Sequence, residues 1–336
     1  MKKRELGVLL AVISAFFVAC KPEFSVNDEK QDISIAYCLL DKDETNHYIK
    51  IYKAFLTEEN AYTFASNSGI EAICYMDSIE VVMEEYENGK LNRTTKCDTT
   101  TAIPKDAGIF PYPTQILYVA KNTKLNPAAT YRLKLKNKYT GKESHAETNI
   151  VNGFYISLPA GELDLTYDKL VNCGFTLPVN GSSYEIYQTL RYIEEDKTTG
   201  EKTNHSVRRK VSNGEVNPTG ATIIKYTISN IYKTVGDQVK KNDKVKRYID
   251  TYKCVDYEVW IAGKVLSSYI RANNQPSTVV NNKVDYTNFI SEDNSAFGIF
   301  SSRDSSKRAY VISAKSEDSL VYGQYTKHLG FVKSTD

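Results

Sequence analysis

Residues 131–136 read Tyr131-Arg132-Leu133-Lys134-Leu135-Lys136, and this stretch decides the fold class. Its apolar side chains fall on one face and its three cations on the other, which is the period of two of a half-buried antiparallel strand. The turn pair Thr140-Gly141 follows, and Ser144 to Ile150 returns beside the first strand. The segment therefore predicts a β-hairpin with one face buried and the other in water.

The same alternation predicts further strands before residue 152. Their ranges are Ile33–Leu39, Ile49–Phe55, Ile79–Met83, Leu91–Thr95 and Gln115–Lys121. Asn88-Gly89 is a strong signal for a tight hairpin turn between two of them. About seven short strands with little helix between them are typical of two antiparallel sheets packed face to face. Residues 32–152 are therefore expected to form an immunoglobulin-like β-sandwich.

Residues 153–336 are predicted to form a second β-rich domain. The expected strands are Tyr184–Glu194, Asn204–Val211, Ala221–Tyr232 and Cys254–Ile261. Between Gly263 and Ala272 the apolar side chains fall at helical spacing, which predicts one short amphipathic helix. Asp318–Leu329 fits either a final helix or a frayed strand. Roughly 305 residues follow position 31, more than one core usually supports, so the fold class is all-β with tandem β-sandwich domains.

The amino terminus has the layout of an export signal. Lys2-Lys3-Arg4 precedes an apolar run from Leu6 to Val18, and residues 1–19 are predicted to be a signal peptide. The run is shorter than the roughly 20 residues that a membrane-spanning helix needs. Phe17-Val18-Ala19-Cys20 resembles the lipobox of bacterial lipoproteins, which implies cleavage before Cys20 and a lipid on its sulfur. The alternative is an ordinary cleaved signal peptide with a chance cysteine.

Residues 20–31 are expected to form a short polar tether between the lipidated Cys20 and the folded body. Lys21 stands where an Asp favours retention in the inner membrane of some bacteria, so outer-membrane placement is expected. The sequence leaves open whether the body faces the periplasm or the cell surface. No later segment reaches 18 apolar residues, so the lipid is the only membrane attachment expected.

Charge and cysteine content exclude several classes of protein. Without residues 1–19 the chain has 40 basic and 40 acidic residues, whereas a nucleic-acid-binding protein is expected to carry a basic excess. The basic runs Arg208-Arg209-Lys210 and Lys240 to Arg247 are interpreted as solvated hairpin tips. Five thiols remain after Cys20, an odd number with no C-x-x-C spacing, so neither zinc nor a redox dithiol is predicted. Structural thiols are expected, and a disulfide is left open.

No catalytic motif is present, and no enzyme, catalytic residue, metal or cofactor is predicted. The four histidines, His47, His145, His205 and His328, lie in different segments and are expected at surfaces or edge strands. Asp41 to Thr45 begins like a calcium loop but lacks the glycine and the final glutamate, so a polar turn is preferred. An enzyme acting on glycans ranks third among the hypotheses.

One long loop is a candidate contact surface. Thr94 to Thr114 has no clear periodicity, and its Phe110 and Tyr112 flank Pro111, so we predict these two aromatic residues as ligand-binding residues. The alternative is that both rings cap the end of the sandwich. The chain also has 25 tyrosines against one tryptophan. Tyrosine fits half-buried sheet surfaces, and it also fits an aromatic binding face for sugars or peptides.

Several short motifs resemble a family of Bacteroidota lipoproteins of unknown function. Tyr37 to Leu40, His47 to Ile51 and Thr130 to Leu133 are similar to its N-terminal sandwich. The C-terminal motifs, in the family's order, are Val255–Ile261, Tyr269-Ile270, Asn288-Phe289-Ile290 and Phe297-Gly298-Ile299-Phe300. The chain departs from the family at Asp293 to Ala296, where a glycine-rich approach is usual.

Such lipoproteins are often associated with TonB-dependent outer-membrane transporters, so the resemblance implies a binding or accessory role beside a nutrient transporter. It brings no catalytic residues. The expected function is a lipid-anchored, non-enzymatic protein of the cell envelope, with the membrane and an envelope protein as partners. The alternative is a structural adhesin or fimbria-like subunit whose strands add edge to edge.

Overall fold

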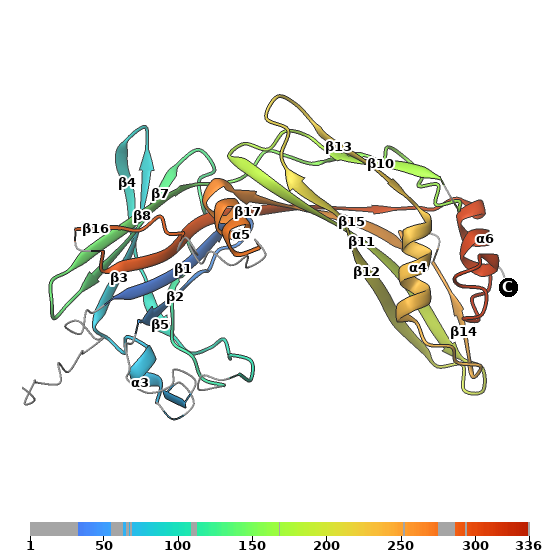
Figure 1. Cartoon of the computed structure of the whole chain (residues 1–336), viewed down its shortest axis with the longest axis horizontal. Coiled ribbons are helices and arrows are strands. Elements are labelled where there is room, and N and C mark those ends of the chain that lie inside the picture. The colour runs from blue at the N-terminus through green and yellow to red at the C-terminus, as the bar shows by residue number, and fades with distance from the viewer. Residues whose placement is uncertain are drawn as a thin grey trace, which may run out of the picture.

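The computed structural model confirms a mostly β protein, with 49% of residues in strands and 13% in helices. It describes residues 33–54, 63–64, 67, 69–108, 113–167, 169–250, 253–274, 286–292 and 294–334. The described residues form two lobes joined by one long sheet (Figure 1).

The largest sheet of the described residues has nine strands and runs through both lobes. In spatial order it contains β12 (Lys202–Glu215), β11 (Gly181–Asp196), β15 (Val255–Gly263), β17 (Ala296–Tyr310), β1 (Ser34–Asp41), β2 (His47–Lys53), β6 (Leu117–Ala120) and β5 (Asp98–Thr100), while β14 (Val245–Tyr248) also pairs with β11.

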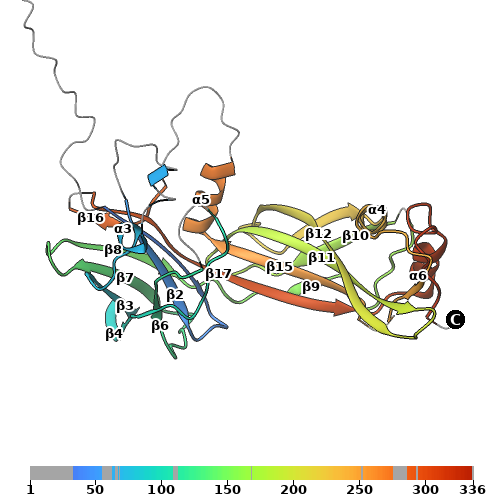
Figure 2. The same ribbon diagram turned by 90° about the horizontal axis from the view of Figure 1, so that it is seen from below.

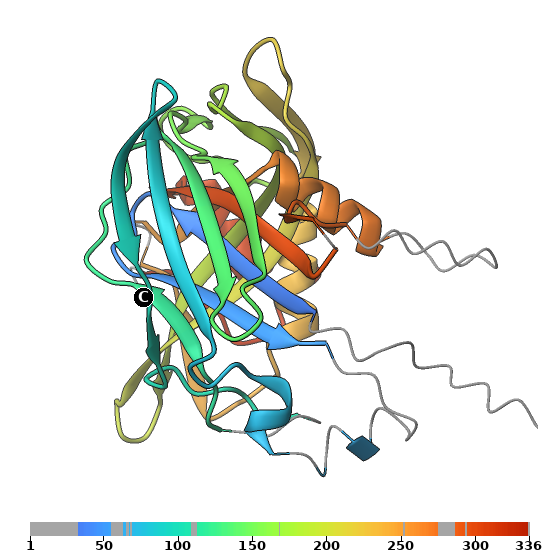
Figure 3. The same cartoon turned by 90° about the vertical axis from the view of Figure 1, so that its left-hand side faces the viewer.

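A five-stranded sheet covers the N-terminal part of the large sheet and completes the first lobe. Its order is β16 (Ile290–Ser291), β8 (Glu143–Asn149), β7 (Thr130–Asn137), β3 (Ile79–Glu87) and β4 (Lys90–Lys96). Figure 3 shows its cyan and green strands in front of the blue strands of the large sheet. Leu40 and Ile49 from one sheet and Leu133 from the other share a single buried cluster, so the lobe is a two-layer sandwich.

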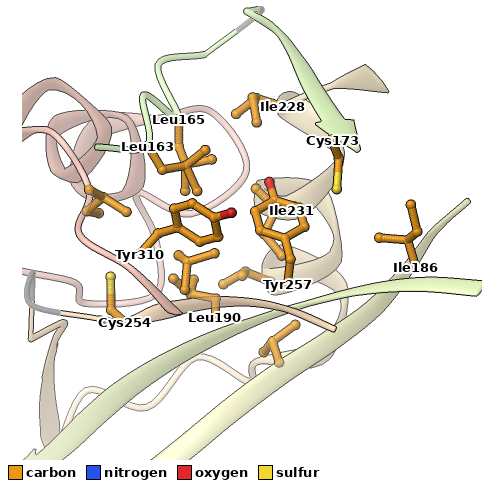
Figure 4. Close-up of a cluster of buried hydrophobic side chains, with 14 of the residues drawn as sticks. Leu163, Leu165, Cys173, Ile186, Leu190, Ile228, Ile231, Cys254, Tyr257 and Tyr310 are labelled. Carbon is orange, nitrogen blue, oxygen red and sulfur yellow. The ribbon is translucent and has the colours of Figure 1, made fainter. Parts of the chain in front are cut away.

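The second lobe packs a three-stranded sheet and helices on the C-terminal part of the large sheet. The sheet contains β13 (Thr222–Thr227), β10 (Leu170–Phe175) and β9 (Ile156–Leu158), and the helices are α4 (Ser229–Gln238) and α6 (Ala314–Tyr322). Its core places Tyr257 and Tyr310 among apolar side chains (Figure 4). Tyr232 donates to the carbonyls of Leu165 at 2.7 Å and Ser316 at 3.0 Å, whereas the buried Tyr310 hydroxyl has no hydrogen-bond partner among the described residues.

Strand β17 belongs to both lobes. Its first half, from Ala296 to Arg303, pairs in parallel with β1, and its second half, from Arg303 to Tyr310, pairs antiparallel with β15. Figure 2 shows it running from one lobe into the other. Phe289 and β16 also pack in the first lobe. The division of the chain into domains at residues 32–152 and 153–336 stays a prediction. The pairing of β17 with β1 and of β16 with β8 shows that the chain returns to the first lobe near its C-terminal end.

The strongest sequence patterns are confirmed. Strand β7 buries Tyr131, Leu133 and Leu135, as the alternation predicts. Asn88 and Gly89 both have positive φ, 51° and 76°, in the turn between β3 and β4. The long hairpin of β11 and β12 is present, and the helix predicted from residue 263 is α5 (Lys264–Asn274).

Other expectations need correction. The second half contains α4 and α6 besides α5, so the prediction of one helix is wrong, although α6 overlaps Asp318–Leu329, for which a final helix is one of the two alternatives. The strand predicted to reach Tyr232 ends at Thr227, because Ile231, Tyr232 and Val235 are buried at helical spacing in α4. Helix α3 (Ile70–Ile73) is one short turn. Among the described helices, none has both the length and the apolar character needed to cross a bilayer.

The two basic runs do not lie at hairpin tips, although residues 240–244 of the second run are exposed to solvent as predicted. Arg208-Arg209-Lys210 lies within β12, where Arg208 and Lys210 point outward and Arg209 points toward the core. The second run leads into β14, and its Arg247 is buried and bonded to Glu194 at 2.6 Å. Strand periodicity therefore overrides the charge pattern, because alternate residues of a strand face opposite sides of the sheet.

Candidate functional site

The predicted site residues lie outside the described residues. These are Cys20, Phe110 and Tyr112, so the lipidation and the aromatic contact surface stay predictions. The described ends of the long loop are bonded to each other. Lys105 donates its backbone N–H to the carbonyl of Pro113 at 2.7 Å, and the Gln115 amide donates to the carbonyls of Ile103 and Pro104 at 3.2 Å.

The thiols of the described residues are free and buried. They are Cys38, Cys74, Cys97, Cys173 and Cys254. Burial raises the pKa of Cys97 to about 12, and burial does the same for Cys173 and Cys254. A thiol with such a pKa is almost never a thiolate near neutral pH and therefore reacts slowly. Structural packing is the role that their geometry supports.

The segment weighed as a calcium loop carries an acidic cluster, which we define as Asp41, Asp43 and Asp304. The Lys42 ammonium lies 2.6 Å from the Asp43 carboxylate and 3.2 Å from that of Asp304. Burial raises the pKa of Asp304, although Lys42 opposes this shift. A lysine cation thus already pairs with two of the three carboxylates that a metal ion would need.

A buried polar cluster lies inside the second lobe. The Gln188 amide donates to the Tyr257 hydroxyl at 2.8 Å, and the Arg209 guanidinium donates to the Gln188 carbonyl oxygen at 2.8 Å. Burial lowers the pKa of Arg209 and raises that of Tyr226, whose hydroxyl contacts Tyr257. Gln188 is fully buried, so this cluster serves packing rather than ligand access.

The outer face of the large sheet differs between the two lobes. In the second lobe it carries paired charges, such as Arg208 with Glu258 at 2.6 Å and Lys210 with Glu185 at 2.5 Å. In the first lobe, β1 buries every second residue toward the sandwich core, beginning with Ser34, and turns the intervening residues outward. These outward residues include Ile35 and Tyr37, which give this part of the outer face apolar and aromatic side chains, and Lys50 of β2 pairs with Tyr37 on the same face.

A hollow on this aromatic surface, the α5 pocket, is the candidate binding site. It lies between helix α5 and strands β1 and β17 and has a volume of about 310 Å³. Its lining residues are Ile33, Ile35, Tyr37, Ala54, Tyr269, Asn273, Tyr286, Thr287, Phe297 and Gly298. None of these residues carries a formal charge at neutral pH.

Helix α5 stands on the outer face of the sheet (Figure 2) and forms one wall of the pocket. Its start is tied to the sheet because the Leu266 N–H donates to the Ser301 hydroxyl at 3.1 Å. The Ser267 and Ser183 hydroxyls lie 2.6 Å apart and link it to β11. At the pocket, the rings of Tyr269 and Tyr37 meet edge to face with centroids 6.2 Å apart. Aromatic pairs favour this arrangement, which helps to fix both rings.

Asn288 positions the segment that carries the lining residues Tyr286 and Thr287. Its side-chain amide donates to the Phe300 carbonyl at 2.9 Å, and its side-chain oxygen accepts from the Phe300 N–H at 2.9 Å. The Asn288 N–H also donates to the carbonyl of Gly298 at 3.3 Å. Side chain and backbone together therefore hold this segment against β17.

Gly298 is required at the floor of the pocket. Its φ is 111°, a conformation that residues with a Cβ rarely adopt. A Cβ built there would overlap the carbonyl oxygen of Ala36 and lie 2.8 Å from its carbonyl carbon. Glycine thus allows β1 and β17 to approach closely beneath the pocket.

The described lining of the pocket offers aromatic rings and neutral polar groups. Its described lining contains no carboxylate, imidazole or thiol, which are the common general bases and nucleophiles. The lining also includes the phenol groups of Tyr269 and Tyr286, which can donate and accept hydrogen bonds. Aromatic walls with a few neutral polar groups are typical of small-molecule sites.

Sequence reasoning missed this pocket because its residues come from five separate segments between positions 33 and 298. The chain pairing that joins them, β1 with β17, spans more than 250 residues. The only available signal was the abundance of tyrosine, which does not indicate which tyrosines meet.

Comparisons with known proteins give no assignment. No protein-family model and no curated protein matches the sequence. Among solved structures, the chain is similar to the C-terminal globular domain of an oligosaccharyltransferase from Pyrococcus abyssi, with 12% identity and a TM-score of 0.19. The match covers 80% of this chain and 43% of that one, so this chain spans less than half of its length. A TM-score this low carries no argument about fold or function.

Proposed function

We propose that the protein is a lipid-anchored component of the outer membrane that binds a ligand in the α5 pocket without chemical conversion. In this proposal, Cys20 carries the lipid, the first lobe is an immunoglobulin-like sandwich and the second lobe is a further sandwich. The observation that carries the binding role is the uncharged aromatic pocket on an otherwise charged sheet face.

The position of the pocket also supports a role at the membrane. Ile33 lines the pocket and is 13 residues from Cys20, since 33 − 20 = 13. A fully extended chain of that length spans at most about 45 Å. A ligand bound there would stay within that distance of a lipid on Cys20, close enough for exchange with a membrane transporter. An accessory role beside a TonB-dependent transporter fits this geometry.

The anchor is tested with Cys20→Ala in the producing bacterium. We expect the wild-type protein in the membrane fraction, with mass spectrometry finding acyl chains on an N-terminal Cys20. The variant should lose the acyl chains and leave the outer membrane. Wild-type protein with an unmodified terminus, or recovered from the cytosol, would refute the anchor.

The binding role is tested with N-phenyl-1-naphthylamine, an uncharged fluorescent probe, and with Tyr269→Ala. We expect the full-length lipidated protein in detergent to bind the probe and the variant to lose at least tenfold in affinity. The control is Tyr139→Ala, because Tyr139 is 85% exposed in a turn of the five-stranded sheet. Equal binding by all three proteins would place the probe elsewhere and refute the pocket as the site.

The rival function, an adhesin or fimbria-like subunit, would require an open strand edge. Strand β12 is the outermost strand at one end of the large sheet and is 14 residues long. Its Arg208 and Lys210 are charged, and cationic side chains on an edge strand oppose pairing with another chain. Sedimentation at increasing concentration separates the two functions, and concentration-dependent polymers would support the rival.

A further inference from the structure

We infer that the α5 pocket recognises one uncharged sugar ring, such as the terminal residue of a neutral glycan. This inference rests on the proposed binding role and deepens it by naming the chemical class of the ligand. It follows from the charge, the hydrogen-bonding groups and the size of the pocket.

Charge separates this pocket from the other hollows of the described surface. Four other hollows each include charged side chains, such as Lys142 and Glu143 in one and Glu215 and Arg271 in another. The α5 pocket includes none among ten lining residues, in a chain with 25% charged residues. A charged ligand would lose hydration there without gaining an ionic partner among the lining residues, which costs several kcal/mol. The pocket is therefore suited to an uncharged ligand.

The polar groups of the pocket favour a ligand with hydroxyl groups over a purely apolar one. Five of the ten lining residues carry neutral hydrogen-bonding groups: Tyr37, Tyr269, Tyr286, Thr287 and Asn273. The Asn273 amide already donates to the Tyr269 carbonyl at 2.9 Å and the Thr287 hydroxyl already accepts from the Phe289 N–H at 3.1 Å, but an amide and a hydroxyl each have capacity for further hydrogen bonds. A sugar ring has an apolar C–H face, which packs on an aromatic ring, and hydroxyls at its edge, which pair with hydroxyl and amide groups. A hydrocarbon would use the rings but would cover polar groups that it cannot pair with, at a cost in free energy.

Size limits the ligand to about one ring. The volume of about 310 Å³ lies at the lower end of the range for small-molecule sites, about 300–1,000 Å³. We therefore expect one residue of a glycan to enter, with the rest of the glycan in solvent.

The test is isothermal titration calorimetry on the full-length lipidated protein in detergent. The probes are methyl glucoside, methyl galactoside and methyl mannoside, each compared with the uronic acid that differs from it only at C6. We expect at least one neutral glycoside to bind, and its uronic acid to bind at least tenfold more weakly. Tyr269→Ala should weaken binding at least tenfold, Tyr269→Phe by about threefold to tenfold through one lost hydrogen bond, and Tyr139→Ala not at all.

The outcomes separate the ligand class from the binding role. Equal binding of the uronic acid, or no effect of Tyr269→Ala, would overturn the inference. If no glycoside binds while N-phenyl-1-naphthylamine still binds through Tyr269, the ligand class is wrong and the binding role stands. If neither binds, both are refuted. Thermal melting of each variant shows whether it is folded. If Tyr269→Ala does not fold, Asn273→Ala replaces it, because Asn273 lines the pocket at an exposed position.

Discussion

Replacement of Gly298 by alanine should destabilise the whole protein, because this residue allows β1 and β17 to pair across the first lobe. At a φ of 111° the added Cβ strains the backbone by about 1–3 kcal/mol. The same Cβ would overlap the carbonyl oxygen of Ala36, so the two strands must separate locally. Two weakened ladder hydrogen bonds would cost a further 0.5–1.5 kcal/mol each, on the order of 4 kcal/mol in total.

This loss is large beside the 5–15 kcal/mol that typically stabilises a folded domain. With roughly 2 °C per kcal/mol for a large domain, the midpoint of thermal unfolding should fall by about 8 °C or more. The assay is thermal unfolding followed by circular dichroism. The matched control is Gly108→Ala, where a Cβ would meet no atom within 4 Å, so the midpoint should stay the same or rise slightly. A Gly298→Ala midpoint within 2 °C of wild type would refute the reasoning.

Three further predictions concern buried hydroxyls, a buried carboxylate and the acidic cluster. Tyr310→Phe should change the free energy of unfolding by less than about 0.5 kcal/mol, because its hydroxyl is unpaired among the described residues. Tyr232→Phe should lower the free energy of unfolding by about 1–3 kcal/mol, because it removes the hydrogen bonds to Leu165 and Ser316. Urea titration compares the two variants, and a larger loss for Tyr310→Phe would contradict the prediction. Burial by itself would raise the pKa of Glu85, but its hydrogen bonds and a neighbouring guanidinium lower it. The Glu85 carboxylate therefore stabilises the fold above about pH 4.5, and this contribution is lost as the pH falls through its lowered pKa. The difference in free energy of unfolding between wild type and Glu85→Gln should therefore narrow in acid. A difference that does not change with pH would contradict this prediction. Calcium or EDTA should leave the thermal midpoint unchanged, because Lys42 pairs with two carboxylates of the acidic cluster and Arg303 lies 4.0 Å from the third. A rise with calcium would show that the lysine is displaced.

Local sequence patterns predict much of this fold because a strand or hairpin depends on neighbouring residues. The alternation of apolar and charged residues from Tyr131 to Lys136 predicts a strand without reference to the rest of the chain. In the same way, Asn88-Gly89 predicts a turn that requires positive φ. Helix α5 is found for the same reason. Helix α4 is missed because the alternation of β13 continues to Tyr232 when the sequence alone is read from Ala221. The helical spacing is recognisable only when Ile231, Tyr232 and Val235 are considered together, after the strand has ended at Thr227.

The long-range pairing and the candidate site are not predictable in this way. Phe297 to Phe300 is readable as a motif, but nothing local indicates that it pairs in parallel with β1. The α5 pocket depends on that pairing, since Ile35 and Phe297 are paired residues that meet only when the two strands join. A site assembled from distant segments has no fixed spacing along the chain, so neither its existence nor its lack of charge is visible in the sequence.

Strand β17 also connects the candidate site to the second lobe mechanically. Its first half lines the α5 pocket, and its second half pairs with β15, while α5 follows β15 directly along the chain. A ligand that presses α5 and β17 together would therefore act on two elements that both continue into the second lobe. Hydrogen exchange should then slow in β15 as well as in β1 when the pocket is filled, because both strands share their hydrogen bonds with β17.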